Sequence, residues 1–189
     1  LRRRGRNMST RAAIFLDRDD TIVYDEGYMS RPDQIRLLPG VAQALQKAAT
    51  RFRLYLVTNQ SGIGRGYYSL ADAEACNERL LELLQLPEPG FQGICIAPEA
   101  PGEPSKYRKP SPAYLLEAIE RDGLDKTTCY MIGDKTSDLE CGLSAGIQAV
   151  LVGKGTSSAR ADAAHFATVH GLWVFGTLPE ALDSIMKRD

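Results

Sequence analysis

The chain has 189 residues, of which 43% are hydrophobic and 25% charged, values typical of one globular domain with a substantial core. It holds no apolar run near the roughly 20 residues that span a bilayer and no apolar leader before Ile14, so we expect a soluble, cytoplasmic protein. Five of its 23 basic residues lie within residues 1–11, so the rest of the chain is acidic, which argues against a nucleic-acid-binding groove. Residues 1–11 are expected to form a flexible basic tail and residues 12–189 a single domain.

Short apolar segments alternate with helical patterns along the chain. Strands are predicted over residues 12–16, 53–57, 91–97, 128–132 and 149–152, with an edge strand over 172–175. Helices are predicted after Gly40, from Ser69 to about Leu86, from Ser111 to Gly123, up to Gly146, and over residues 177–186. In the third of these, Pro112 is expected in the first turn. Residues 22–34 are predicted to form a polar loop, and the alternation as a whole predicts right-handed βαβ units around one parallel sheet.

Polar side chains stand directly after three of these strands. Asp17 and Asp19 follow the first strand, Thr58 follows the second, Asp134 follows the fourth, and a proline-rich loop delivers Lys109. Because the carboxyl ends of parallel strands meet at one edge of the sheet, we expect these side chains to lie together. Such a group predicts phosphoryl transfer. A carboxylate nucleophile repels a phosphate dianion, so a divalent cation and a lysine must offset the repulsion, and a second acid can protonate the leaving oxygen.

Four motifs carry this group, namely residues 17–21, 57–59, 109–110 and 133–138. In this order they resemble the motifs of the haloacid dehalogenase superfamily of phosphatases. The resemblance covers residues 12–186. It implies an α/β fold with three αβα layers, Rossmann-like, with a mostly parallel central sheet, and it implies Mg²⁺ as the cofactor. Both intervals that could hold a cap domain are short, so none is expected.

Four segments are similar in particular to the histidinol-phosphate and heptose-bisphosphate phosphatase branch, namely residues 15–19, 25–28, 58–63 and 108–110. By this resemblance, Asp17 is the nucleophile and a metal ligand. Asp19 is the acid and base and binds the metal through its backbone carbonyl, and Asp134 is the third ligand. Thr58 and Lys109 hold the phosphoryl group. The residues expected to contact the substrate are Asp25, Glu26, Gly27, Tyr28, Thr58, Asn59, Gln60, Ser61, Arg108, Lys109 and Lys135.

The chain departs from this family at two places. Asp20 stands where the superfamily most often has glycine, and a modest effect is expected because aspartate tolerates turn conformations. Many members of the branch carry a zinc loop ahead of the lysine motif, whereas here only Cys95 lies nearby. One cysteine cannot build a four-ligand site, so no structural zinc is predicted. The four cysteines are widely spaced and are interpreted as small buried hydrophobes.

The expected function is that of a Mg²⁺-dependent phosphatase that acts on a small phosphorylated metabolite through an aspartyl-phosphate at Asp17. The substrate favoured by the resemblance is a sugar bisphosphate such as D-glycero-D-manno-heptose 1,7-bisphosphate. Histidinol phosphate is the alternative substrate, and a non-catalytic phospho-accepting or phosphate-binding module is the alternative of another class. Asp138 is interpreted as a helix N-terminal acid that orients the site. Lys135 could also be a solvated charge, and Tyr67 and Tyr68 have no assigned role. We expect a monomer with neither a nucleic-acid nor a membrane partner.

Overall fold

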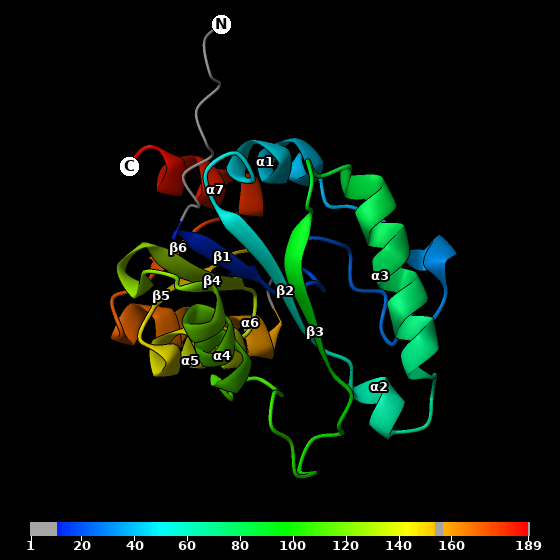
Figure 1. Cartoon of the computed structure of the whole chain (residues 1–189). Coiled ribbons are helices and arrows are strands. Elements are labelled where there is room, and N and C mark those ends of the chain that lie inside the picture. Colours follow the sequence, from blue (N-terminus) through cyan, green and yellow to red (C-terminus); the bar gives the residue numbers. More distant parts are fainter. Residues whose placement is uncertain (1–10, 154–156, 189) are drawn as a thin grey trace, which may run out of the picture.

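The computed structural model describes residues 11–153 and 157–188, and its centre is a six-stranded sheet (Figure 1). The strands are β1 (Ala13–Leu16), β2 (Arg53–Asn59), β3 (Phe91–Ala97), β4 (Cys129–Gly133), β5 (Gln148–Leu151) and β6 (Trp173–Val174). Neighbouring strands all pair in parallel in the order β3-β2-β1-β4-β5-β6. The predicted parallel sheet is confirmed, and β6 is the predicted edge strand.

Helices cover both faces of this sheet (Figure 1). On one face lie α1 (Val41–Ala48), α3 (Leu70–Leu84) and α7 (Leu178–Met186). On the other face lie α4 (Ala113–Asp122), α5 (Thr136–Ala145) and α6 (Ser158–Val169). Alternate residues of β1 serve the two cores, since Ile14 and Leu16 pack on the first side and Phe15 packs on the second. The expected three-layer αβα, Rossmann-like fold is confirmed.

Local signals set the helix ends. At the start of α3, Asp72 N donates to Ser69 Oγ at 3.2 Å and Ser69 N donates to Asp72 Oδ2 at 2.8 Å, the reciprocal pair that the sequence predicts. Gly123 and Gly146 end α4 and α5 in the left-handed conformation, as expected. Pro112 precedes α4 as its N-cap, so its predicted place in the first turn is wrong by one residue.

The interval between β1 and α1, residues 17–40, is a loop with one 3-10 helix, Pro32–Gln34. Ile22, Val23 and Met29 of this loop are buried in the core shared with α1 and α3, so the expectation of a polar loop is wrong at these positions. Their apolar side chains anchor the loop to the fold. Between β2 and β3 the chain adds the short helix α2 (Ser61–Gly64) and α3. Neither interval holds a cap domain.

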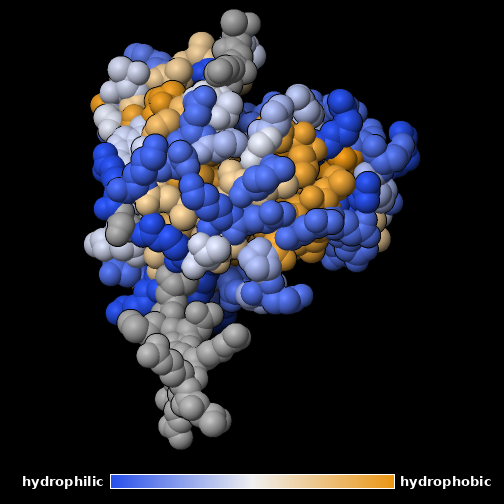
Figure 2. Space-filling view, turned by 90° about the horizontal axis from the view of Figure 1, so that it is seen from above, coloured by the Kyte–Doolittle hydropathy of each residue, from blue (hydrophilic) through white to orange (hydrophobic). Residues whose placement is uncertain are grey.

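The predicted tail lies outside the described residues except for Arg11, whose Nε donates to Gly123 O at 3.0 Å. All four cysteines are buried and unpaired, as expected. Within residues 11–153 and 157–188, no helix combines the length and the apolar character needed to cross a bilayer. The face shown in Figure 2 is largely hydrophilic, with hydrophobic residues showing at the right and at the upper left of the view.

Candidate active site

Lys109 joins the carboxylates that stand beyond β1 and β4. Its Nζ lies 2.5 Å from Asp17 Oδ1 and 2.7 Å from Asp138 Oδ1, and it donates to Val57 O at 2.8 Å. The side chains of Lys109, Asp17 and Asp138 are all buried. The sequence predicts Asp17 and Lys109 in one site, and the structure brings them together from 92 positions apart.

Asn59, at the end of β2, fixes the backbone of Lys109. Its Oδ1 accepts from Lys109 N at 3.0 Å, and its Nδ2 donates to Lys109 O at 3.1 Å. Both ends of the Asn59 amide are therefore engaged by a single residue. This pair ties the proline-rich loop to the sheet, which is how an irregular segment can hold a lysine at a defined point.

Burial and charge act together on the two groups of the central ion pair. Burial lowers the pKa of Lys109, but Asp138 and Asp17 raise it by more, so it lies above its ordinary value. Burial raises the pKa of Asp17, and the opposing effect of Lys109 does not cancel this. Lys109 is therefore a fixed cation that lies directly beside the Asp17 carboxyl group.

Three carboxylates form a cluster with the composition of a cation site. One oxygen each of Asp17, Asp134 and Asp138 lies within 4.8 Å of the others. Asp134 Oδ1 is buried, and no group in the described part of the chain bonds to it. A buried oxygen without a partner costs free energy, and a cation would satisfy it. Burial, and then the charge of Asp17, raise the pKa of Asp134 to about 8. These oxygens fit a hard divalent cation such as Mg²⁺.

Asp138 has both of its oxygens engaged within the protein. Oδ1 meets Lys109, and Oδ2 accepts from Lys135 N at 3.0 Å at the start of α5. Gly133 permits this packing, since a Cβ there would lie 2.2 Å from Asp138 Oδ2. The geometry fits the interpretation of Asp138 as an acid that orients the site.

Asp19 is held by a buried arginine. Arg18 Nε donates to Asp19 Oδ1 at 2.8 Å and Nη2 to Oδ2 at 3.3 Å, while Nη1 donates to Asn77 Oδ1 on α3 at 3.0 Å. Arg18 has no exposed surface. Neither Arg18 nor Asn77 is among the sequence-predicted site residues. Asn77 had a signal, because it is a polar residue on the buried face of α3 beside Ala73 and Leu80.

Gln60 links Asp19 to Thr58. Its Nε2 donates to Asp19 Oδ2 at 2.9 Å and to Thr58 Oγ1 at 2.7 Å. Because Thr58 Oγ1 accepts here, its own hydrogen is directed elsewhere and can serve a phosphoryl oxygen. Tyr68 completes the set, since its hydroxyl donates to Gln60 Oε1 at 2.7 Å. The sequence patterns indicate no role for Tyr68.

A cleft of about 270 Å³ opens beside this network. It is lined by Arg18, Asp19, Asp25, Gly27, Tyr28, Met29, Asn59, Gln60, Ser61, Tyr68 and Lys135. Seven of the residues expected to contact the substrate are in this set. The structure thus gathers residues from the β1 loop, from the end of β2 and from the start of α5 around one small cavity.

The other four expected substrate contacts do not line this cleft: Thr58 and Lys109 belong to the network beside it, and Glu26 and Arg108 make other contacts. Glu26 forms an ion pair with Arg36 on the exposed side of the β1 loop. Arg108 donates through Nη1 to Glu99 O at 2.9 Å and through its backbone N to Ser105 Oγ at 3.0 Å. In this structure Arg108 therefore braces the loop that carries Lys109.

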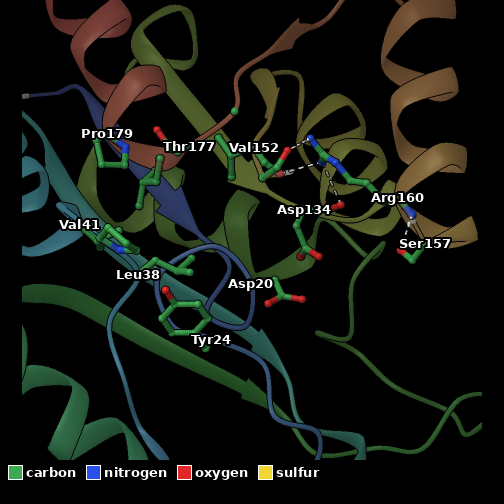
Figure 3. A pocket seen from close by; sticks show the side chains of 14 residues that line it. Asp20, Tyr24, Leu38, Val41, Asp134, Val152, Ser157, Arg160, Thr177 and Pro179 are labelled. Carbon is green, nitrogen blue, oxygen red and sulfur yellow. Dashed lines mark hydrogen bonds between the residues drawn. The ribbon is translucent and has the colours of Figure 1, made fainter. Parts of the chain in front are cut away.

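A second cavity of about 460 Å³ adjoins Asp134 on another side (Figure 3). Asp20, Tyr24 and Thr177 are among its lining residues. Arg160 reaches into it from α6, where Nη1 donates to Val152 O at 2.7 Å and, more distantly, to Asp134 O at 3.5 Å (Figure 3). Arg160 thereby ties the loops that follow β4 and β5, a contact that the sequence patterns do not indicate.

The backbone of Asp20 explains why glycine is common at its position. Its φ is 56°, in the left-handed region that side chains other than those of glycine, asparagine and aspartate adopt with difficulty. Its Oδ1 accepts from Asp25 N at 3.1 Å, so the side chain supports the turn that it strains. Glycine would adopt this φ without strain, whereas aspartate at position 20 offsets the strain with a hydrogen bond.

For Asp20→Gly we expect the free energy of unfolding to stay within about 1 kcal/mol of wild type, because relief of backbone strain opposes the loss of this bond and the added chain entropy. Urea unfolding would measure it. As a control, Asp20→Ala keeps the strain and loses the bond, so it should be less stable than Asp20→Gly. An Asp20→Gly variant that is the less stable of the two would contradict this account.

The chain is similar to known proteins along most of its length. The HAD-hydrolase-like family model matches residues 106–181. A relative from Helicobacter pylori strain J99, named D-glycero-beta-D-manno-heptose-1,7-bisphosphate 7-phosphatase, is 41% identical over 144 residues, which cover 75% of this chain and 82% of that protein. The Escherichia coli K12 protein of the same name is 32% identical over 184 residues, which cover 93% of this chain and 94% of that protein.

A solved structure described as D,D-heptose 1,7-bisphosphate phosphatase from B. bronchiseptica, complexed with magnesium and phosphate, superposes with a TM-score of 0.81. It is 25% identical and covers 94% of this chain and 99% of that one. Fold and relatives together define a class of enzymes that hydrolyse phosphate monoesters. The chain belongs to the haloacid dehalogenase-like hydrolases and is a phosphatase.

Proposed function

We propose that the protein is a Mg²⁺-dependent sugar-bisphosphate phosphatase whose substrate is a D-glycero-D-manno-heptose 1,7-bisphosphate. The observation that carries the proposal is the convergence of Lys109 on Asp17 beside Asp134, whose Oδ1 is buried without a partner in the described chain. The names of the H. pylori and E. coli relatives support the choice of substrate.

In the proposed reaction, an oxygen of Asp17 attacks phosphorus while the bond from phosphorus to the leaving oxygen breaks. Asp19 gives its proton to that oxygen, so the sugar leaves as an alcohol. Asp19 then takes a proton from water, whose oxygen attacks the aspartyl-phosphate, and inorganic phosphate and free Asp17 result. Lys109 and Thr58 donate to the phosphoryl oxygens throughout. Mg²⁺, held by Asp17, Asp134 and the Asp19 carbonyl, would offset the repulsion between carboxylate and phosphate.

The cleft supports a polar, anionic substrate. Its walls carry the amides of Asn59 and Gln60, the hydroxyl of Ser61 and the ammonium group of Lys135. Amides and hydroxyls suit the hydroxyl groups of a sugar, and an ammonium group suits a second phosphate. The imidazole of histidinol phosphate would have fewer partners among these groups.

Side-by-side kinetics test the choice of substrate. With Mg²⁺ present, kcat/KM for heptose 1,7-bisphosphate should exceed that for histidinol phosphate by at least about 100-fold, since a site built for hydroxyl groups disfavours ligands that lack them. The reverse order would overturn the substrate assignment. Release of many phosphates per enzyme molecule would exclude a phospho-accepting switch, whereas one stable phosphorylation event would support it.

Metal binding should depend on pH, because a raised pKa at Asp134 means that a proton must leave before a cation binds. Below about pH 8, each pH unit should weaken the apparent Mg²⁺ affinity by up to about tenfold. Thermal unfolding at one fixed Mg²⁺ concentration would show this, with a larger rise in Tm at pH 8 than at pH 6. Asp134→Asn is the matched control and should show little rise at either pH. An equal rise at both pH values in wild type would contradict the role of Asp134.

The proposal also includes the absence of structural zinc, a single domain over residues 12–189, a monomeric state and a cytoplasmic location. The first is supported by the lone Cys95 near the proline-rich loop and the second by the single continuous sheet. The monomeric state and the location stay predictions from the sequence.

A further inference from the structure

Tyr68 takes no part in the reaction proposed above, yet its hydroxyl is bound inside the site. It donates to Gln60 Oε1 at 2.7 Å, and its ring packs over Gly62, where a Cβ would lie 2.1 Å from a ring carbon. A residue larger than glycine at position 62 would therefore push the ring away. Burial raises the pKa of Tyr68 to about 12, so the hydroxyl keeps its proton near neutral pH.

The chemistry of the neighbouring groups determines which group donates in each hydrogen bond that links Tyr68, Gln60, Thr58 and Asp19. Both Asp19 oxygens accept from Arg18, which can only donate, so the Gln60 amide turns its NH₂ group toward Asp19. That orientation uses one N–H on Asp19 Oδ2 at 2.9 Å and the other on Thr58 Oγ1 at 2.7 Å. The amide oxygen then faces Tyr68, which must donate. Without this donor the amide is free to turn over, and two acceptor oxygens would face each other at Asp19.

Asp19 is thus gripped from two sides. Arg18, fastened to Asn77 on α3, donates to Oδ1 at 2.8 Å and more weakly to Oδ2 at 3.3 Å. Gln60, fastened to Tyr68, holds Oδ2. Arg18 alone leaves the carboxyl plane free to tilt about the guanidinium edge, and the second contact removes that freedom. Asp19 is partly exposed, with 15% of its side chain accessible, so its orientation toward the cleft is the property that these contacts control.

We propose that Tyr68 is a positioning residue that acts through Gln60 to hold the Asp19 carboxyl group in line with the leaving oxygen. The proposal rests on the proposed function, in which Asp19 is the acid. As the bond from Asp17 oxygen to phosphorus forms and the bond from phosphorus to the leaving oxygen breaks, the Asp19 proton moves to that oxygen and Asp19 becomes a carboxylate. Tyr68 exchanges no proton in this step.

The test uses substrates that differ in their need for an acid. Sugar phosphates leave as poor, alkoxide-like groups and require protonation, whereas p-nitrophenyl phosphate leaves as a stable phenolate and does not. For Tyr68→Phe, kcat/KM should fall about tenfold on heptose 1,7-bisphosphate and on fructose 1,6-bisphosphate, and less than about twofold on p-nitrophenyl phosphate. Equal losses on both ester types would reveal a merely structural role, and no loss on either would leave Tyr68 without function; both results overturn the proposal.

Tyr67→Phe is the matched control, since it removes a hydroxyl one residue away for which the described chain offers no hydrogen-bond partner, and it keeps the ring that meets Tyr28 edge-on. All three activities should stay near wild type. Gln60→Leu supplies a second measurement. Adding Tyr68→Phe to Gln60→Leu should change the ratio of alkyl to aryl activity less than twofold, because Tyr68 acts only through that amide. If the two substitutions instead lowered this ratio multiplicatively, Tyr68 would not act through Gln60, and the proposal would be overturned.

These outcomes are separable from those of the proposed function. If wild type hydrolyses fructose 1,6-bisphosphate and not the heptose ester, the substrate assignment fails while the ratio of alkyl to aryl activity still tests Tyr68. If Tyr68→Phe shows no selective loss of activity on sugar phosphates while the heptose ester is the preferred substrate, only the positioning role of Tyr68 fails. Circular dichroism and the unfolding midpoint of each variant would identify a loss that comes from misfolding.

Discussion

Asp17→Asn is expected to lower phosphate release by at least about 10⁴-fold on every substrate, because the amide has no oxygen able to attack phosphorus. The protein itself should remain folded. Burial raises the pKa of Asp17, so a neutral side chain of the same shape removes an unfavourable buried charge, while its oxygen can still accept from Lys109. A loss of activity at unchanged unfolding midpoint would therefore assign the effect to chemistry.

Asp33→Asn is the matched control. Asp33 lies on the exposed 3-10 helix, where it pairs with Arg31, and the same change of acid to amide there should leave turnover unchanged. Continuous phosphate detection with saturating Mg²⁺ would follow both variants. Metal-dependent release from Asp17→Asn at rates near those of wild type would mean that another group is the nucleophile.

Lys109→Met is expected to damage both activity and stability. Methionine keeps most of the length of the side chain but leaves Asp17 and Asp138 buried without their shared cation. Removing one partner of a buried ion pair costs about 3–5 kcal/mol, and losing a donor to the phosphoryl group lowers kcat by about 10²–10³-fold. Urea unfolding and steady-state kinetics would measure the two effects separately.

The loss of stability should also depend on pH. Lys109 is the main group that lowers the pKa of Asp17, so its removal raises that pKa further. The folded variant then holds a proton on Asp17 that the unfolded chain gives up near pH 4. Its free energy of unfolding therefore falls as the pH rises from about 4 to the raised pKa of Asp17. The deficit relative to wild type should be larger at pH 8 than at pH 5.5. Lys106→Met, an exposed lysine of the same loop, should leave activity and stability near wild type, and an equal effect of both variants would contradict this account.

The sheet and the core of the site could be predicted because their signals are local in sequence. The apolar run that becomes β1 is buried at every position, and Asp17 follows it directly, so strand and carboxylate are read from adjacent residues. Helix α6 gave no such signal. Its buried residues are Ala163 and Ala167, and alanine marks no apolar stripe, although it lets the helix pack closely on its neighbours.

The hydrogen-bond partners of Asp19 could not be predicted from the sequence, for another reason. Arg18 meets Asn77 from 59 positions away, and Gln60 meets Asp19 from 41 positions away. Such pairs depend on how α3 and β2 pack beside the β1 loop, which no periodicity within one segment contains. Arg160 is a similar case, because its contacts with the loops after β4 and β5 come from the helix that was not predicted.

The central position of β1 in the sheet also determines the order in which its two neighbouring strands can pair with it during folding. β1 is completed on one edge by β2, which begins 40 residues later, but on the other edge only by β4, where Ala13 pairs with Cys129. A growing chain that has emerged only to residue 128 carries Asp17 on a hydrophobic strand with one open edge, and Asp17 N has yet to meet Ile132 O. Such pairing across a long separation slows folding and leaves an aggregation-prone edge in the meantime. Asp17 is thus made before β4 but is set in place only once β4 has paired with β1.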